Sequence, residues 1–451
     1  MGLLDSAHIA HVFIVLHPEL DRVLVLRGAR GPEGELALPS FVAEERHPAD
    51  AIYLNREFSR MTGIDGYVLG SIASVPSRMR VYAMEARRGA AEHGRSAAGT
   101  PAWVVPAALE EVHPNAAAWA ASAIAPDRGR PAWTRRGFLG EAVAWVERAL
   151  SDAGRGKVQS FEQVRTWEFS VVIRFRAGGR DYFFKALPEG AADEGARIER
   201  LAAEFPDALP AVIARDRSWV LLEGAIGPCL EDVADVTAWE AAARAYARLQ
   251  MAFSGRCAEL QLPVRSLDDL ASAIDGLLEA NDVLLIDTPE GLTGAEARAL
   301  KGRARQFEAW CRELAVMEPV LRTLDHGDLW ASNVLVTERG PVFIDWTDAV
   351  ECHPFVGMFL LLEGAFLEKQ LKGGADDAKR RIARAYLAPF AERYDAAALH
   401  RAFDAAQRIA PLFHAWRFHR DVLPTLRTPE MVELVPFFLR RLLTGTRSSP
   451  G

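Results

Sequence analysis

Three polar residues in the last third of the sequence have types and spacing that suit chemistry on a phosphate group. Asp328, Asn333 and Asp345 lie in one segment, which from Leu324 reads LDHGDLWASNVLVTERGPVFIDWTDA. An aspartate can orient a hydroxyl group and accept its proton. An amide and a carboxylate supply hard oxygen ligands for Mg²⁺, which neutralises phosphate oxygens during phosphoryl transfer. Residues 322–348 therefore predict a catalytic and metal-binding segment.

The residues between Asn333 and Asp345 are expected to bring these two side chains together. Residues 334–336 and 342–344 are short β-rich runs, and residues 337–340 between them are typical of a turn. A hairpin would return Asp345 to the neighbourhood of Asn333. Both side chains could then bind one cation.

The spacing within this segment matches that of kinases. In kinases an Asp acts on the acceptor hydroxyl, and an Asn five residues later shares the metal with a second Asp. Asp328 and Asn333 have this spacing, and His326 would brace the loop rather than take part in the chemistry. The alternative is a pair of polar turns with no catalytic role. The ordered occurrence of all these residues, with plausible strands between them, favours catalysis.

The run HGDLWASNVLV followed by VFIDWTDA resembles the aminoglycoside phosphotransferase and choline kinase-like superfamily. Eukaryotic protein kinases instead carry HRD and DFG where this chain has HGD (326–328) and DWT (345–347). The resemblance covers residues 160–450. It implies a two-lobed protein kinase-like fold and a cleft in which a small molecule is phosphorylated.

The resemblance implies an O-phosphotransferase that uses ATP and Mg²⁺ and acts on a hydroxyl group of a small molecule. Suitable acceptors are an aminoglycoside-type antibiotic, an amino alcohol, a sugar or a related metabolite. The catalytic base would be Asp328, and the metal ligands would be Asn333 and Asp345. The alternative is a catalytically inactive kinase-fold protein that binds or senses a metabolite. The presence of every polar residue that catalysis needs favours the enzyme.

The superfamily also has a lysine on the third N-lobe strand, paired with a glutamate on the next helix. Lys185, in the stretch DYFFKAL (181–187), lies at the end of an apolar strand and is expected to reach the α- and β-phosphates. Its partner would be Glu194, which lies seven residues before Leu201 as in the family, and Glu199 is the alternative. A lysine on an edge strand can also extend into solvent. The position of Lys185 upstream of the motif favours nucleotide binding.

Two other stretches complete the expected nucleotide site. The run 218–224, which includes Glu223, occupies the place of the hinge between lobes, where backbone groups usually hold adenine. No GxGxxG covers the phosphates, and the family's own loop is variable. The strands around residues 167–170 are expected to cover the phosphates instead, with Ser170 as a candidate contact.

The hydrophobic pattern predicts the elements that carry these residues. Strands are expected at 158–164, 168–176, 181–187, 211–214 and 218–223, with a helix at 193–204. From Asp235 onward the chain is mostly helical in pattern. We therefore predict an α+β fold with a small β-rich N-lobe at 157–227 and a helical C-lobe at 228–451.

Residues 1–130 predict a separate small α/β domain, joined to the N-lobe by a linker at 131–156. The linker holds an amphipathic helix at 137–152. The elements expected in the domain are a hairpin at 9–16 and 22–27, a helix at 48–61, strands at 67–75 and 79–86, and a closing unit at 102–112 and 115–123.

This N-terminal domain resembles a Nudix domain. The resemblance rests on VLVLR (23–27), LP (38–39), REF (56–58), TGI (62–64) and AWVVP (102–106) with Leu109. An active Nudix helix carries paired glutamates that bind Mg²⁺, but Arg60 and Met61 occupy those places, and Ser40-Phe41 replaces the expected glycine pair. Because Glu57 alone would be a poor metal site, we expect a non-catalytic Nudix-like domain.

The composition narrows the class of protein. The 451 residues allow two or three domains, and 53 basic against 61 acidic residues give a net charge of -8. This charge argues against broad nucleic-acid binding. None of the four cysteines lies in a CxxC spacing, which predicts free thiols in a reducing cytoplasm. We expect no signal peptide and no membrane span. The partner is expected to be a small-molecule acceptor, and the sequence leaves its identity and the oligomeric state open.

Overall fold

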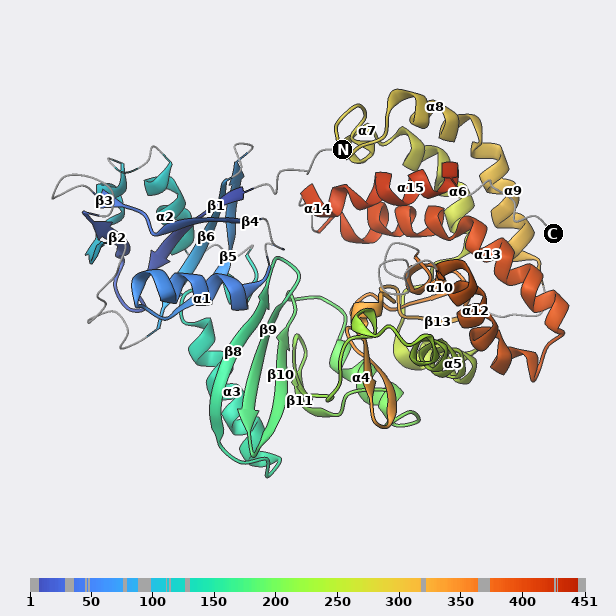
Figure 1. The fold of residues 1–451 in the computed structure, drawn as a ribbon, viewed down its shortest axis with the longest axis horizontal. Helices are drawn as coiled ribbons and strands as arrows, with labels where there is room; N and C mark the ends of the chain where they lie inside the picture. Colours follow the sequence, from blue (N-terminus) through green and yellow to red (C-terminus); the bar gives the residue numbers. More distant parts are fainter. Residues whose placement is uncertain are drawn as a thin grey trace. The chain divides into compact units, whose positions relative to one another are not determined.

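The computed structural model describes most of the chain and divides it into two compact units. The described residues are 8–28, 36–44, 47, 49–75, 79–87, 99–110, 112, 115–125, 130–317, 322–363, 374–425, 427 and 429–444. The first unit comprises residues 1–195 and 212–224, and the second comprises residues 196–211 and 225–451. Figure 1 follows the chain through both units. The domain boundaries expected near residues 130, 156 and 227 remain predictions.

The first unit begins with a seven-stranded mixed sheet. Its central strand β1 (His8–Leu16) runs parallel to β6 (Met79–Ala86) and antiparallel to β4 (Ser40–Glu44). The other strands are β2 (Val23–Arg27), β3 (Leu36–Ala37), β5 (Gly66–Val75) and β7 (Thr100–Val104). The helices are α1 (Ala51–Thr62) and α2 (Ala116–Ile124), with a 3₁₀ turn η1 (Pro106–Leu109). These elements lie close to the predicted ranges.

The hairpin expected between β1 and β2 forms only at its closed end. The two strands pair at Leu16 and Val23, and β2 then runs antiparallel to β7. The cause is competition for one edge of β1. Because β6 pairs with one edge of β1, β4 takes the other edge over residues 8–12 and leaves β2 only the last residue.

Helix α1 begins and ends where local chemistry places its caps. The Asp50 side chain accepts a hydrogen bond from Tyr53 N at 3.0 Å, and Gly63 ends the helix with a φ of 70°. Leu54 and Phe58 of α1 pack against Phe13 on the facing side of the sheet. The helix and this side of the sheet therefore share one apolar core.

The second sheet of this unit has five antiparallel strands in the order β11-β12-β10-β9-β8. They are β8 (Val158–Thr166), β9 (Val171–Ala177), β10 (Arg180–Ala186), β11 (Val212–Asp216) and β12 (Trp219–Glu223). Helix α3 (Phe138–Asp152), preceded by the short turn η2 (Ala132–Thr134), packs Phe138, Val146 and Leu150 into a core with both sheets. The five predicted strands and the linker helix are confirmed.

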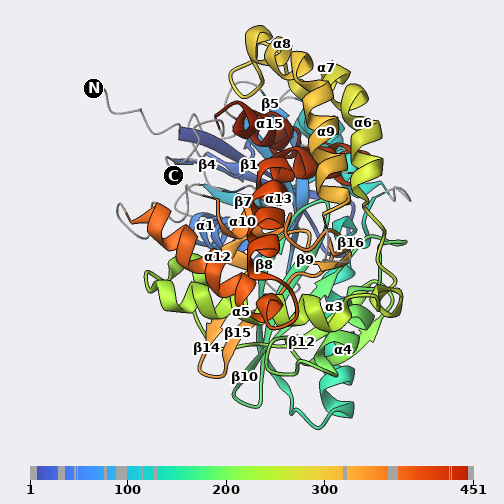
Figure 2. The ribbon, with the colours of Figure 1, turned by 90° about the vertical axis from the view of Figure 1, so that its right-hand side faces the viewer.

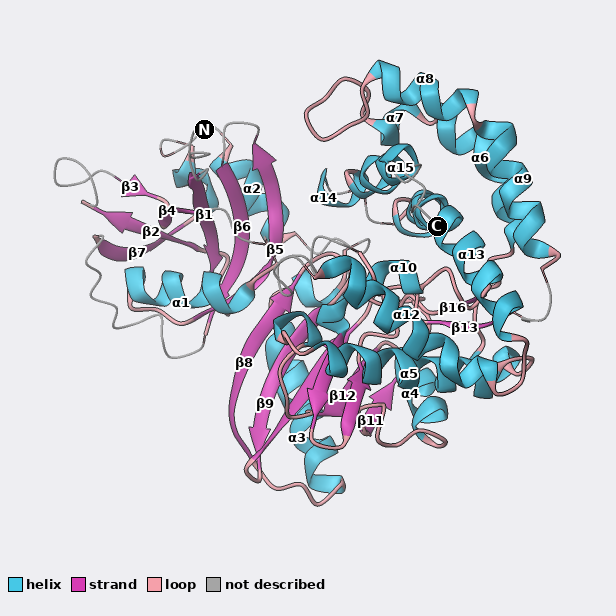
Figure 3. Cartoon of the chain, turned by 45° about the vertical axis from the view of Figure 1, so that its right-hand side comes forward, coloured by secondary structure: helices cyan, strands magenta, loops and turns pink. Residues whose placement is uncertain are grey.

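Helices predominate in the second unit, whereas strands predominate over helices in the first (Figure 3). Over the described ranges, the α-helices wholly within the second unit are α5 (Val236–Phe253), α6 (Leu267–Glu279), α7 (Asn281–Leu284), α8 (Gly294–Gly302), α9 (Ala304–Ala315), α10 (Met358–Leu361), α12 (Ala375–Ala391), α13 (Ala396–Arg417), α14 (Pro429–Val432) and α15 (Leu434–Thr444). Helix α4 (Glu194–Ala202) crosses the division between the units. Figures 1 and 2 show α5 beside α12 and α13 beside α15. The fold is thus mixed, with a β-sheet lobe and a helical region.

Four short strands in the second unit carry the candidate site. β13 (Thr323–Asp325) pairs with β16 (Val350–Cys352), and β14 (Val334–Thr337) pairs with β15 (Gly340–Phe343).

Among the described residues, no helix is both long and apolar enough to cross a membrane.

Candidate active site

The β14–β15 hairpin brings the two expected metal ligands together, as predicted. Val334 pairs with Phe343, and the backbone N–H of Ile344 donates to the carbonyl oxygen of Asn333 at 3.0 Å. Asp345 follows Ile344 directly in the chain. Asn333 and Asp345 are twelve residues apart in the sequence, and the tight turn of the β14–β15 hairpin brings their backbones close together.

The side chain of Asn333 is oriented by Asp328. Its amide nitrogen Nδ2 donates to the carbonyl oxygen and to the carboxylate oxygen Oδ2 of Asp328, both at 2.8 Å. Because the amide nitrogen is used in this way, Oδ1 of Asn333 is the atom suited to a cation. A carbonyl-type oxygen and the carboxylate of Asp345 would together be a donor set that fits Mg²⁺.

Asp345 has a left-handed backbone conformation, with a φ of 63°. Such a conformation is uncommon for residues other than glycine, and Asp and Asn tolerate it best. Thr347 Oγ1 donates to Oδ1 of Asp345 at 3.2 Å, which fixes the direction of the carboxylate. A strained residue at the end of a hairpin is common at functional sites.

Asp328 has an environment that makes its carboxylate more basic. Desolvation by the surrounding protein, together with the charges of Asp348 and Asp345, raises the pKa of Asp328 to about 7. The charge of Arg417 and the hydrogen bond from Asn333 oppose this rise. A raised pKa near neutrality suits a group that accepts a proton from a hydroxyl.

His326 braces the loop, as expected from the sequence. Its Nδ1 accepts from the backbone N–H of Asp328 at 3.3 Å, so Nε2 carries the hydrogen and donates to Ile344 O at 2.9 Å. The imidazole also lies 4.5 Å from the ring of Trp346, measured between ring centroids. His326 therefore links the loop of Asp328 to the hairpin end that holds Asp345.

Asp325 is a buried residue of this loop that was not predicted from the sequence. Its Oδ1 accepts from Gly327 N at 2.8 Å, and its Oδ2 accepts from the Tyr246 hydroxyl at 3.2 Å. Tyr246 in turn accepts from His326 N at 2.8 Å. Burial raises the pKa of Asp325, while the charge of Arg417 and these hydrogen bonds counteract the rise. The sequence held one signal for this residue: Asp325 follows a short apolar stretch directly before HGD, and a charged residue buried there must have hydrogen-bond partners.

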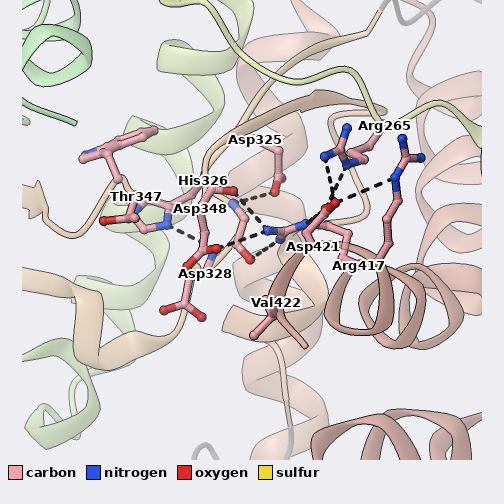
Figure 4. A network of polar contacts seen from close by, with 12 residues as sticks. Arg265, Asp325, His326, Asp328, Thr347, Asp348, Arg417, Asp421 and Val422 are labelled. Carbon is pink, nitrogen blue, oxygen red and sulfur yellow. Dashed lines mark hydrogen bonds and ion pairs between the residues drawn. The ribbon is translucent and has the colours of Figure 1, made fainter. Parts of the chain in front are cut away.

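A chain of charged residues also holds the loop, and it too was missed in the sequence (Figure 4). Arg417, at the end of α13, donates to the carbonyl oxygens of Gly327 at 2.6 Å and Asp348 at 3.1 Å. Its Nε lies 3.8 Å from Asp421. Asp421 accepts two hydrogen bonds of 2.8 Å from Arg265. Asp421 lies in the π-helical turn η6 (Phe418–Val422), a type of turn that is frequent at functional sites.

We expect Gly327→Ala to lower both stability and kcat. Gly327 has a φ of 78°, and an added Cβ would lie 2.0 Å from Asp348 O and 2.9 Å from Arg417 Nη1. A left-handed alanine costs about 1–2 kcal/mol before any clash. The loop must therefore move, and Asp328 moves with it. Thermal unfolding and steady-state kinetics measure the two losses.

Gly276→Ala is the matched control for this variant. Gly276 lies within α6, and a Cβ there would meet no atom within 4 Å. Alanine in a helix is about 0.5–1 kcal/mol more favourable than glycine. The control should therefore raise the melting temperature slightly and leave kcat unchanged. If the Gly327→Ala protein has the wild-type kcat, the close packing of Gly327 against Asp348 and Arg417 does not position the loop that carries Asp328.

We expect Arg417→Lys to lower kcat by about tenfold or more without weakening nucleotide binding. Lysine keeps the charge but lacks the planar fork that reaches two carbonyl oxygens at once. Each lost hydrogen bond from a charged group costs about 1.5–3 kcal/mol. Arg408→Lys is the control, because Arg408 is on the same helix but its 2.8 Å ion pair with Glu313 is exposed. Equal kcat values for the two variants would show that Arg417 does not position the loop.

Lys185 and Glu194 form an ion pair in the first unit. Nζ of Lys185 lies 2.8 Å from Oε2 of Glu194, and the two side chains are 9% and 1% exposed. Lys185 is held on β10 between its neighbours β9 and β12, and Glu194 begins α4. The structure thus pairs Lys185 with Glu194, the first of the two glutamates considered. A buried pair of this kind holds the ammonium group in one place.

The two remaining predicted nucleotide residues also lie in the first unit. Ser170 is buried, and its carbonyl oxygen accepts from Trp167 N at 3.1 Å, which closes the turn between β8 and β9. The side chain of Glu223 forms an ion pair with Arg180 and lies 3.4 Å from Arg155. The adenine contact expected of this run would come from its backbone groups, and it remains a prediction.

Comparison with known proteins gives a family for the segment that contains these residues. Residues 160–356 match the phosphotransferase enzyme family. The matched range includes Lys185, Asp328, Asn333 and Asp345, and the match supports an enzyme that transfers phosphate. No curated protein matches the sequence closely enough to count as a relative.

Several solved structures are similar to this chain over about two thirds of its length. A choline/ethanolamine kinase family protein from Mesorhizobium loti has 16% identity, covers 69% of this chain and 95% of its own, and has a TM-score of 0.46. A macrolide 2'-phosphotransferase from Brachybacterium faecium has 16% identity, covers 68% and 99%, and has a TM-score of 0.44. The GDP complex of an aminoglycoside 2'-phosphotransferase has 17% identity, covers 67% and 96%, and has a TM-score of 0.47.

Proposed function

We propose that this protein is an ATP- and Mg²⁺-dependent O-phosphotransferase that phosphorylates a hydroxyl group of a small molecule. The observation that carries the proposal is the contact between Asn333 and Asp328. One side-chain amide donates to the candidate base through its nitrogen, so that its oxygen is the atom that could serve as a metal ligand together with Asp345. A pair of unrelated polar turns would not need this coupling.

In the proposed reaction Asp328 accepts the proton of the acceptor hydroxyl. The hydroxyl oxygen forms a bond to the γ-phosphorus of ATP, and the bond from that phosphorus to the β–γ bridging oxygen breaks. ADP leaves, and the proton passes from Asp328 to solvent. Asn333 and Asp345 would hold Mg²⁺, which supplies positive charge against the phosphate oxygens when bound.

The first unit supplies the groups that bind the nucleotide in this proposal. Lys185, held by Glu194, contacts the α- and β-phosphates. The turn at residues 167–170 covers the phosphates, with Ser170 as the candidate contact. Backbone groups of the run that ends in Glu223 and Gly224 hold the adenine. Gly224 N donates to Asp181 O at 2.8 Å, which fixes the end of this run to β10.

We also propose that the N-terminal domain is a Nudix-like domain without hydrolase activity. Glu57 is the one glutamate of the expected metal-binding set, and Arg60 donates to its Oε2 from Nε at 3.0 Å and from Nη2 at 2.8 Å. A carboxylate paired with arginine is a poor ligand for Mg²⁺. Diphosphate cleavage by the full-length Asp328→Asn protein would overturn this proposal.

The test of the proposed function is a screen for acceptors with the purified full-length protein. ATP or GTP with Mg²⁺ is supplied together with aminoglycosides, macrolides, amino alcohols, sugars or nucleosides, and phosphorylated products are detected by mass. The proposal requires that at least one class be phosphorylated at a hydroxyl group. Tight nucleotide binding with no transfer to any class would instead favour a kinase-fold binding or sensor protein.

A further inference from the structure

The turn between β8 and β9 is held in place by residues that precede the N-lobe. Trp133, in the turn η2 of the linker, donates from its indole Nε1 to the carbonyl oxygen of Trp167 at 2.9 Å. Trp133 is completely buried. Residues 167–170 form the turn that the proposed function assigns to the nucleotide phosphates. A residue of the linker therefore fixes the backbone of this turn directly.

The strand that leads into the turn is held by the N-terminal domain. Gln163 on β8 accepts from Val68 N at 2.9 Å and donates to Val68 O at 2.7 Å, so its side-chain amide pairs with β5 as a strand neighbour would. Asn55 of α1 donates to the same Gln163 oxygen at 3.0 Å. Gln163 is 4% exposed. Buried polar groups that are satisfied in this way hold their elements in a single arrangement.

Further contacts continue this support up to the turn itself. Thr166 N donates to Ala49 O at 3.1 Å, and Arg165 forms a β-bridge with Asp50. The Trp167 ring meets the imidazole of His47 edge-on, with 5.5 Å between ring centroids. The segment that begins α1 is therefore in contact with three consecutive residues, 165–167.

We propose that the N-terminal domain and the linker that follows it position the β8–β9 turn and so set the affinity for the nucleotide phosphates. Trp133 and Gln163 are positioning residues in this account, because they act on the nucleotide through the turn. Without these contacts the β8–β9 turn would sample several conformations. Nucleotide binding would then have to order the turn, and the lost conformational entropy would lower the affinity. The inference rests on the proposed function, which gives the turn its ligand.

Coupling of this kind acts in both directions. A change in the N-terminal domain that moves α1 or β5 alters the turn, and nucleotide bound at the turn must favour the arrangement that the domain imposes. The domain then serves the phosphotransferase without any hydrolysis of its own. This gives a function to a domain whose Glu57 is paired with Arg60.

The variant that tests this proposal is Trp133→Phe in the full-length protein. Phenylalanine keeps an aromatic ring in the core and removes the N–H that donates to Trp167 O, together with part of the indole ring, a loss of volume that the Trp239→Phe control shares. We expect the dissociation constant for Mg·ATP to rise about three- to tenfold, the range that corresponds to one lost hydrogen bond. The acceptor KM and the kcat at saturating nucleotide should stay unchanged. Calorimetry gives the binding constant in the absence of acceptor.

Trp239→Phe is the matched control. Trp239 is also completely buried, and its Nε1 donates to a backbone carbonyl, Val233 O, at the same 2.9 Å. The control loses the same type of bond in the helical unit, so general destabilisation should affect both variants alike. We expect the control to bind Mg·ATP as the wild type does.

A second variant, Gln163→Met, removes the pairing with Val68 while keeping the length of the side chain. It should weaken Mg·ATP binding at least as much as Trp133→Phe, and thermal unfolding checks that both variants fold. If the folded variants bind Mg·ATP as tightly as the Trp239→Phe control, the inference is overturned. If the wild type itself binds no nucleotide, the proposed function fails, and the two failures are thus distinguished.

Discussion

Replacing Asp328 with asparagine is expected to lower kcat by about 10²–10⁴-fold, the usual contribution of a general base. The dissociation constant for Mg·ATP should stay within about twofold of the wild-type value, because Asn333 and Asp345 are unchanged. Asparagine has the shape of aspartate, and its oxygen can still accept from Asn333 Nδ2. The variant therefore removes the proton acceptor and little else. Steady-state kinetics and calorimetry measure the two quantities.

Asp207→Asn is the control for this substitution. The Asp207 side chain is 66% exposed, and its ion pair with Arg339 spans 3.5 Å at the surface. Exposed pairs of this kind contribute about 0–1 kcal/mol. The control should keep wild-type kcat and stability. If the Asp328→Asn protein transfers phosphate at the wild-type rate, the proposed mechanism is contradicted.

Replacing Asp345 with asparagine is expected to weaken Mg·ATP binding by at least about tenfold and to lower kcat as well. Loss of a group that merely supports a metal ligand costs about 10–100-fold in metal affinity, and loss of the ligand's charge should cost no less. Asparagine tolerates the left-handed backbone at this position, whereas alanine would add strain. The effect can therefore be attributed to the carboxylate. Titration with nucleotide, with and without Mg²⁺, measures it.

Asp287→Asn is the matched control for Asp345→Asn. Asp287 has a φ of 61°, and its Oδ1 accepts from Gly294 N at 2.9 Å, a bond that asparagine can also accept. The control should therefore bind Mg·ATP normally. Without Mg²⁺ the Asp345→Asn protein should bind nucleotide as the wild type does. A loss that persists in the absence of Mg²⁺ would show that Asp345 is not acting as a metal ligand.

The parts of the site that are local in sequence could be predicted. The hairpin between Asn333 and Asp345 follows from two short β-rich runs around a turn, and the structure has it. The bracing role of His326 follows from its place two residues before Asp328. The partner of Lys185 could be narrowed to Glu194 or Glu199, because the resemblance to the superfamily implies a glutamate on the helix that follows the strand.

The parts that depend on distant residues could not be predicted. Arg417 lies 90 positions after Gly327, and nothing in the sequence near either residue indicates that they meet. Gln163 and Val68 are 95 positions apart, and a glutamine that completes a strand pair has no sequence signature. The hairpin expected between β1 and β2 was limited to one pair because the competing partner, β4, lies further along the chain. Such competition is decided by tertiary packing.

The most direct test of the central claim follows the oxygens of the γ-phosphate. ATP labelled with ¹⁸O in the three terminal γ-oxygens is incubated with an acceptor, Mg²⁺ and either the wild type or the Asp328→Asn protein. The account predicts that the wild type delivers the labelled phosphoryl group to an acceptor hydroxyl and that the variant delivers almost none. Label found only in inorganic phosphate with every acceptor, or equal transfer by the two proteins, would contradict it.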